Sequence, residues 1–310
     1  MASSSVIIEI EDPQPIPDKA IKLYEYHEIP YFLRGNAYIT DGYRAYLNSK
    51  WCIKSLFMMS NESINIWSHI LGFWYFSFLL IYDNFLKIPY VAGSTLADYL
   101  VFSALLIGFQ LCMLFSAGYH VFCCHSERVF HRWFALDLAG ISLGLCTCYI
   151  PSVYYAFYCH VTLRTLYLTG VCILTILTIS FQAHPHFLTS HWARRRLLLF
   201  CSMVAYGVMP STHWVYLNGG WDQEIVKLFI PRVVVQYILG ILALSFYAFK
   251  IPERYFPGKL NYIGSSHQWW HLLVVIAFCW WHQSCIFYME YLKEHECEAT
   301  TVYTDNMPVL

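Results

Sequence analysis

Two histidines at the start of an apolar run have the spacing of a metal-binding pair. His267 and His271 lie four residues apart in the stretch Ser265–His271. On a helix, side chains at i and i+4 share a face about 5–6 Å apart, which suits two imidazoles on one metal ion. Ser265 or Ser266 is a natural N-cap for such a helix.

Three more polar side chains border apolar runs elsewhere in the chain. Ser116 and His120 are also four residues apart, and Asp137 lies at the start of the next run. Histidines, a carboxylate and a hydroxyl are the groups that a hydrolytic metal site uses. Whether they can act together depends on which helices carry them and on which way those helices run.

The composition indicates a membrane protein. Apolar residues make up 58% of the 310 residues and charged residues 13%, whereas soluble domains carry about 25% charged residues. The formal net charge of −1 excludes a general nucleic-acid binder, because no excess of lysine or arginine is present to neutralise phosphates. The first partner that the sequence implies is therefore a lipid bilayer.

The hydropathy pattern predicts an all-α membrane protein, a seven-transmembrane helix bundle. A spanning helix needs about 20 mostly apolar residues. Pro151 and Pro210 fall inside two of the runs and could kink them. The predicted spans are 67–86, 99–122, 136–158, 166–184, 197–217, 228–249 and 270–289.

The distribution of basic residues predicts the orientation. The N-terminal region and the loops after the second, fourth and sixth spans hold 14 of the 19 lysines and arginines. By the positive-inside rule the N-terminus is cytosolic, and seven crossings leave the C-terminal tail, residues 291–310, lumenal or extracellular. The sequon at Asn61 would then be cytosolic, and we predict that it is not glycosylated.

This orientation gathers the chemically capable residues at one side of the membrane. Ionisable residues at membrane depth usually face the bundle interior and usually have a function. Three histidines with an open position held by water form a catalytic zinc site, so we predict that His120, His267 and His271 bind Zn²⁺. Asp137 could bind the ion, orient its water or act as a base, and Ser116 could hydrogen-bond that water or a substrate carbonyl.

Other polar residues are weaker candidates. His125, His131 and Cys124 are rival ligands in the loop after the second span. His282 lies about three turns beyond His271, and we interpret it as a polar residue of the interior. The stretch Ser60–His69 forms a polar stripe entering the first span, which we interpret as a structural contact to neighbouring helices.

The predicted cytosolic N-terminal region, residues 1–66, precedes the bundle of residues 67–290. Residues 1–20 are acidic and contain prolines, a composition typical of disorder. Residues 21–66 mix aromatic and charged side chains. This stretch could lie on the membrane surface, form a docking face for a partner, or only cap the bundle.

In combination, four motifs resemble those of the progestin and adipoQ receptors, relatives of the adiponectin receptors and alkaline ceramidases. The motifs are Ser60–His69, Ser116-x₃-His120, the stretch from His120 to Asp137, and Ser266-His267-Gln268-x₂-His271. The resemblance implies a seven-helix fold with a cytosolic N-terminus and zinc bound by His120, His267 and His271, with Asp137 contacting the zinc water.

The resemblance leaves two classes of function open. The stretches 36–47, 52–72 and 251–271 are most similar to a branch whose cytosolic N-terminal region holds Raf kinase at the Golgi membrane and damps MAP-kinase signalling. The adiponectin-receptor relatives instead imply a lipid- or hormone-responsive receptor or a zinc-dependent amidase for ceramide-like lipids, with Ser116 and Asp137 as its catalytic residues.

Overall fold

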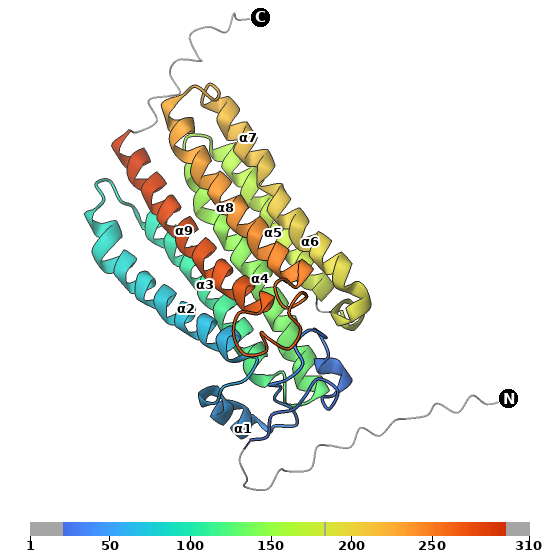
Figure 1. The fold of residues 1–310 in the computed structure, drawn as a ribbon. Helices are drawn as coiled ribbons and strands as arrows, with labels where there is room; N and C mark the ends of the chain where they lie inside the picture. Colours follow the sequence, from blue (N-terminus) through green and yellow to red (C-terminus); the bar gives the residue numbers. More distant parts are fainter. Residues whose placement is uncertain (1–20, 183, 296–310) are drawn as a thin grey trace, which may run out of the picture.

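The computed structural model describes residues 21–182 and 184–295 (Figure 1). Within them the chain is helical, with an isolated antiparallel bridge between Tyr24 and Tyr43. The predicted disorder of residues 1–20, and the tail from residue 296 onward, lie outside this part. The α-helices are α1 (Ser49–Lys54), α2 (Ser63–Tyr82), α3 (Leu96–Phe122), α4 (Glu127–Ala156), α5 (Val161–Gln182), α6 (Ala193–Tyr206), α7 (Val208–Leu217), α8 (Glu224–Phe249) and α9 (Ser266–Glu294).

Six helices of the described part are long and apolar enough to cross a membrane: α2 with its continuation to Tyr90, and α3, α4, α5, α8 and α9. The outward face of α2 shows why lipid is needed. Leu71, Trp74, Phe78 and Ile81 recur every three or four residues and are all at least 60% exposed. A continuous apolar stripe of this kind is unfavourable in water and favourable against acyl chains.

The predicted fifth span, 197–217, is built from two shorter helices, α6 and α7, which join at Gly207. Pro210 has no N–H for the carbonyl four residues earlier. The Tyr149 hydroxyl donates to Met203 O at 2.7 Å and the Tyr237 hydroxyl to Val204 O at 3.2 Å. The interruption therefore lies three residues before the proline, and tyrosines of neighbouring helices compensate carbonyls beside it.

The third predicted span begins earlier than the hydropathy indicates. Helix α4 starts at Glu127, and Asp137 lies ten residues into it instead of at its start. The first turns carry Arg128, His131 and Arg132, and these polar side chains lower the mean hydropathy of this part of the helix. Asp137 is consequently about 15 Å along the helix axis from the first residue of α4.

Helix α3 lies between α2 and α4 and is the most buried of the spanning helices. Small residues allow α3 and α4 to approach closely. A methyl group on Gly140 would lie 3.1 Å from the Cα atom of Cys112, and one on Gly118 would overlap the Trp133 ring. Helix α3 also contacts α9, where Phe109 of α3 stacks on Phe278 of α9 with ring centroids 3.9 Å apart.

Residues 21–62, here called the cap, fold over one end of the bundle (Figure 1). Leu47 and Cys52 of the cap pack with Ile66, Val121 and Cys124 in one apolar cluster. Polar contacts tie the cap to the α8–α9 loop: Thr40 N donates to Asn261 Oδ1 at 2.9 Å, and Gly258 N to Tyr38 O at 3.0 Å. The cap is thus fastened to the bundle at two places.

We expect Gly108→Ala to lower the free energy of unfolding by about 1–3 kcal/mol, because overpacking strains a close helix contact. The added methyl would lie 2.1 Å from Thr147 Oγ1 and 2.7 Å from Thr147 Cβ. Thermal unfolding in detergent measures the loss. Gly240→Ala on α8 is the matched control, because no described atom lies within 4 Å of its added methyl; equal melting temperatures would contradict the close α3–α4 contact.

Candidate metal centre

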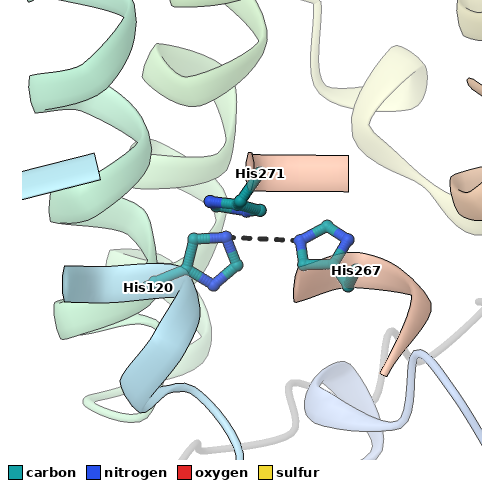
Figure 2. Close-up of side chains that lie close together, drawn as sticks. All are labelled: His120, His267 and His271. Carbon is teal, nitrogen blue, oxygen red and sulfur yellow. Dashed lines mark hydrogen bonds between the residues drawn. The ribbon is translucent and has the colours of Figure 1, made fainter. Parts of the chain in front are cut away.

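The three predicted ligands come from the facing ends of two helices. His120 lies in the last turn of α3, and His267 and His271 lie in the first two turns of α9. Figure 2 shows the three rings turned toward a common point. His120 lies at least 147 residues before the other two in the chain. The three come together because the end of α3 and the start of α9 meet under the cap.

The geometry can hold a metal ion. His120 Nε2 and His267 Nε2 are 3.3 Å apart, and each histidine offers one nitrogen within 4.8 Å of the others. His120 and His271 are buried and His267 is half-buried. His271 Nδ1 is buried and has no hydrogen-bond partner among the described residues. A cation shared by three neutral imidazoles would satisfy nitrogen atoms that otherwise face one another.

Charged residues of the correct sign cap both ligand-bearing helix ends. Arg44 of the cap donates from Nη2 to His120 O at 2.5 Å, at the negative end of α3. At the positive end of α9, the Glu253 carboxylate accepts from Ser266 N at 2.7 Å and from Ser266 Oγ. Arg44 and Glu253 are both buried, so these two interactions fix the helix ends from within.

The expected N-cap of α9 is supplied differently from the prediction. Ser265 occupies the N-cap position, but its side chain makes no capping hydrogen bond. Glu253, thirteen residues before Ser266, takes that role and also accepts from Asn36 Nδ2 at 3.0 Å. No local pattern marks Glu253, because it lies in a loop and acts on a distant helix.

Ser116 and Asp137 lie beside the cluster. Ser116 is buried one turn before His120 on α3, and Asp137 lies on α4, the helix packed against α3. Within the described part, the group whose ligand atoms lie within 4.8 Å of one another contains the three histidines and not Asp137. This arrangement fits a residue that handles water or a proton better than it fits a fourth ligand.

Glu62 and His69 of the stripe Ser60–His69 contact the cluster, and the sequence interpretation missed both contacts. Glu62 Oε2 lies 2.7 Å from His120 Nδ1, and Asn65 Nδ2 donates to the same oxygen at 2.7 Å. Burial favours the neutral Glu62 carboxyl, but the His120 ring and these hydrogen bonds lower its pKa to about 2. The spacing of Glu62, Asn65 and His69 at three and four residues was the available signal, since it places an acid on the stripe.

His69 is the second missed residue. Its ring centroid lies 4.0 Å from that of His271, and the side chain is buried. Neither of its ring nitrogens has a hydrogen-bond partner among residues 21–182 and 184–295. It covers one face of a predicted ligand.

The rival ligands have other partners. His125 Nδ1 lies 3.1 Å from Ser126 Oγ, His131 pairs with Glu127, and Cys124 Sγ lies 3.7 Å from Cys52 Sγ. His282 forms a buried pair with Asp83 at 2.6 Å, as expected for a polar residue of the interior. None of these residues belongs to the three-histidine group found in the described part.

These features define a polytopic helical membrane protein with a candidate metal centre of three histidines. The haemolysin-III-related family model matches residues 57–282. The chain is 51% identical over 280 residues to mouse and to human progestin and adipoQ receptor family member 3, with 90% of each chain covered. It is 34% identical over 257 residues to the fruit-fly adiponectin receptor protein, covering 83% of this chain and 57% of that one.

The chain therefore belongs to the haemolysin-III-related family, and within it to the progestin and adipoQ receptors, as the sequence motifs predict.

We expect the purified protein to bind one divalent metal ion. The variants His120→Ala, His267→Ala and His271→Ala should each lose most of the metal content, because each removes one of three ligands. Elemental analysis of the detergent-solubilised protein measures the metal, and chelation should lower the melting temperature of the wild type but not of the three ligand variants. His213→Ala is the control, because its ring bonds to the Tyr167 hydroxyl outside the cluster. Full metal content in the His267 and His271 variants would contradict the assignment.

Proposed function

We propose that this protein is a seven-span regulator of the Golgi membrane that holds Raf kinase through its cytosolic N-terminal region and damps MAP-kinase signalling. The observation that carries the proposal is the attachment of the cap to both ligand-bearing helix ends, through Arg44 to α3 and through Asn36 and Glu253 to α9. A folded cap of this kind can present a fixed docking face. Similarity to progestin and adipoQ receptor family member 3 extends over 90% of the chain and supports a membrane protein of the progestin and adipoQ receptor type.

The topology follows from the split span and the charges. In this proposal α6 and α7 together form the fifth of seven crossings, in addition to the six long helices. The cap, the α8–α9 loop and the cap-side ends of α4 and α6 hold 13 of the 19 lysines and arginines, which supports a cytosolic cap by the positive-inside rule. The C-terminal tail is then lumenal.

Zinc is the ion that we propose for the metal centre. Tetrahedral zinc with Zn–N bonds of about 2.05 Å separates its ligand atoms by about 3.3 Å, the distance between His120 Nε2 and His267 Nε2. Three imidazoles are also a common zinc donor set. In the regulator, this ion would hold the ends of α3 and α9 together under the cap.

We expect loss of the exposed aromatic surface of the cap to release Raf kinase from Golgi membranes. Tyr31 is 85% exposed, so Tyr31→Asp changes the surface without opening the apolar cluster. Recruitment is measured by co-localisation in cells. Tyr255→Asp, at a 68% exposed tyrosine of the adjoining α8–α9 loop, is the matched control and should retain recruitment. Unchanged recruitment after deletion of residues 1–60 would overturn the docking proposal.

A zinc-dependent lipid amidase is the second candidate, favoured by Ser116, one turn before His120 on α3, and by Asp137 on the adjoining helix α4. Zinc bound by His120, His267 and His271 would polarise a substrate carbonyl and lower the pKa of a water molecule to about 7. Asp137 would accept the proton of that water, and Ser116 would orient the water or the amide carbonyl. An apolar cavity of about 190 Å³ among α4, α7, α8 and α9 offers room for part of an acyl chain, and its lining begins at Leu145, two turns beyond Asp137.

If the protein is an amidase, Asp137→Asn should lower fatty-acid release from ceramides at least about 100-fold, because general-base catalysis contributes roughly 10²–10⁴-fold. Its metal content should stay at the wild-type level, since Asp137 lies outside the ligand group. Fatty acid released from defined ceramides is the measurement, and Ser116→Ala should give a smaller loss. A zinc-loaded wild type that releases no fatty acid would exclude this candidate and leave the regulator standing.

A further inference from the structure

Glu62 contacts the one histidine of the cluster that α3 supplies. Its Oε2 lies 2.7 Å from His120 Nδ1, and 24% of its side chain is exposed. Asn65 Nδ2, one turn later on α2, donates to the same oxygen at 2.7 Å. The carboxylate is therefore held by a second residue, and its approach to His120 does not depend on that ring alone.

The hydrogen-bond chemistry of this contact determines the tautomer of His120. An ionised carboxylate only accepts hydrogen bonds, so Nδ1 of His120 must carry the proton that it donates. In the neutral ring, the lone pair is then on Nε2. That nitrogen faces His267 Nε2 at 3.3 Å, which is the side where the metal would bind.

The backbone around Glu62 is fixed as well. Asn61 N donates to Gly42 O at 3.0 Å, and Glu62 N donates to Ser60 Oγ at 3.3 Å. Arg44, two residues after Gly42, bonds to the carbonyl of His120. The cap thus holds His120 twice: Arg44 fixes its main chain and Glu62 fixes its ring.

We propose that Glu62 is a positioning residue for a divalent metal ion at the histidine cluster, acting through His120 without touching the ion. The proposal rests on the metal centre proposed above. Carboxylates that accept from the second nitrogen of a ligating histidine set its tautomer and its ring orientation, and their loss typically weakens metal binding 10–100-fold.

A second carboxylate–histidine pair in the same molecule supplies a matched control. Asp83 Oδ2 lies 2.6 Å from His282 Nε2, and both side chains are buried. The remaining nitrogen of His282, Nδ1, faces the Gln283 amide at 3.4 Å. His282 is not a member of the three-histidine group of the described residues. Removing the Asp83 charge disturbs a pair of the same chemistry without touching the cluster.

The test is zinc affinity of the full-length protein in detergent, measured by competition with a chelating dye, together with the visible absorption of the cobalt-substituted protein. We expect Glu62→Gln to bind zinc 10–100-fold more weakly and to alter the cobalt bands, because the amide can offer its N–H to His120 and favour the wrong tautomer. Glu62→Asp should recover part of the affinity. Asp83→Asn should stay within twofold of the wild type even where its melting temperature falls.

Zinc affinity of Glu62→Gln within twofold of the wild type would overturn the inference, and so would an equal loss in Asp83→Asn, which would indicate a general loss of stability. A wild-type protein that binds neither zinc nor cobalt would overturn the metal centre itself, and the inference with it. The two failures are distinguishable because only the second is seen before any substitution is made.

Discussion

Polar groups inside a lipid-embedded helix bundle must find their partners within the protein, because hydrocarbon offers none. The end of α3 and the start of α9 bring three imidazoles to one point, where two ring nitrogens face each other at 3.3 Å. Contacts elsewhere in the bundle hold these two helix ends in place. Glycines let α4 lie close against α3, stacked Phe109 and Phe278 join α3 to α9 below the rings, and the cap closes the end above them.

The cap is fastened to both helix ends that carry the three-histidine cluster. The buried side chain of Arg44 bonds to the C-terminal end of α3, and the buried side chain of Glu253 bonds to the N-terminal end of α9. Each side chain has the charge opposite to the partial charge of that helix end. Both contacts involve the cap, because Arg44 belongs to it and Asn36 of the cap donates to Glu253. A change in the separation of the two helix ends must therefore move the cap.

Periodicity and hydropathy account for what the sequence could predict. Seven apolar runs were found, and the spacing of His267 and His271 gave a shared face; helix direction then added His120, which no local spacing connects to them. Pro210 indicated a kink in the fifth span but not its place at Gly207, because the tyrosine hydroxyls beside the interruption come from distant helices. The early start of α4 was missed, because mean hydropathy is low over its charged first turns. Glu62 and Glu253 act across 58 and 13 residues, and such contacts exist only once the chain has folded.

The molecule contains two carboxylate–histidine pairs of similar geometry. Asp83 with His282 and Glu62 with His120 have nearly the same separation, 2.6 and 2.7 Å, and each contains a buried imidazole. They differ at the second nitrogen of the ring. For His282 that atom faces the amide of Gln283, so the pair is complete in itself. For His120 it faces another imidazole nitrogen. Once the carboxylate has fixed the proton on Nδ1, the lone pair on Nε2 needs a proton from His267 or a cation, and the nearby nitrogen of His271 favours the cation.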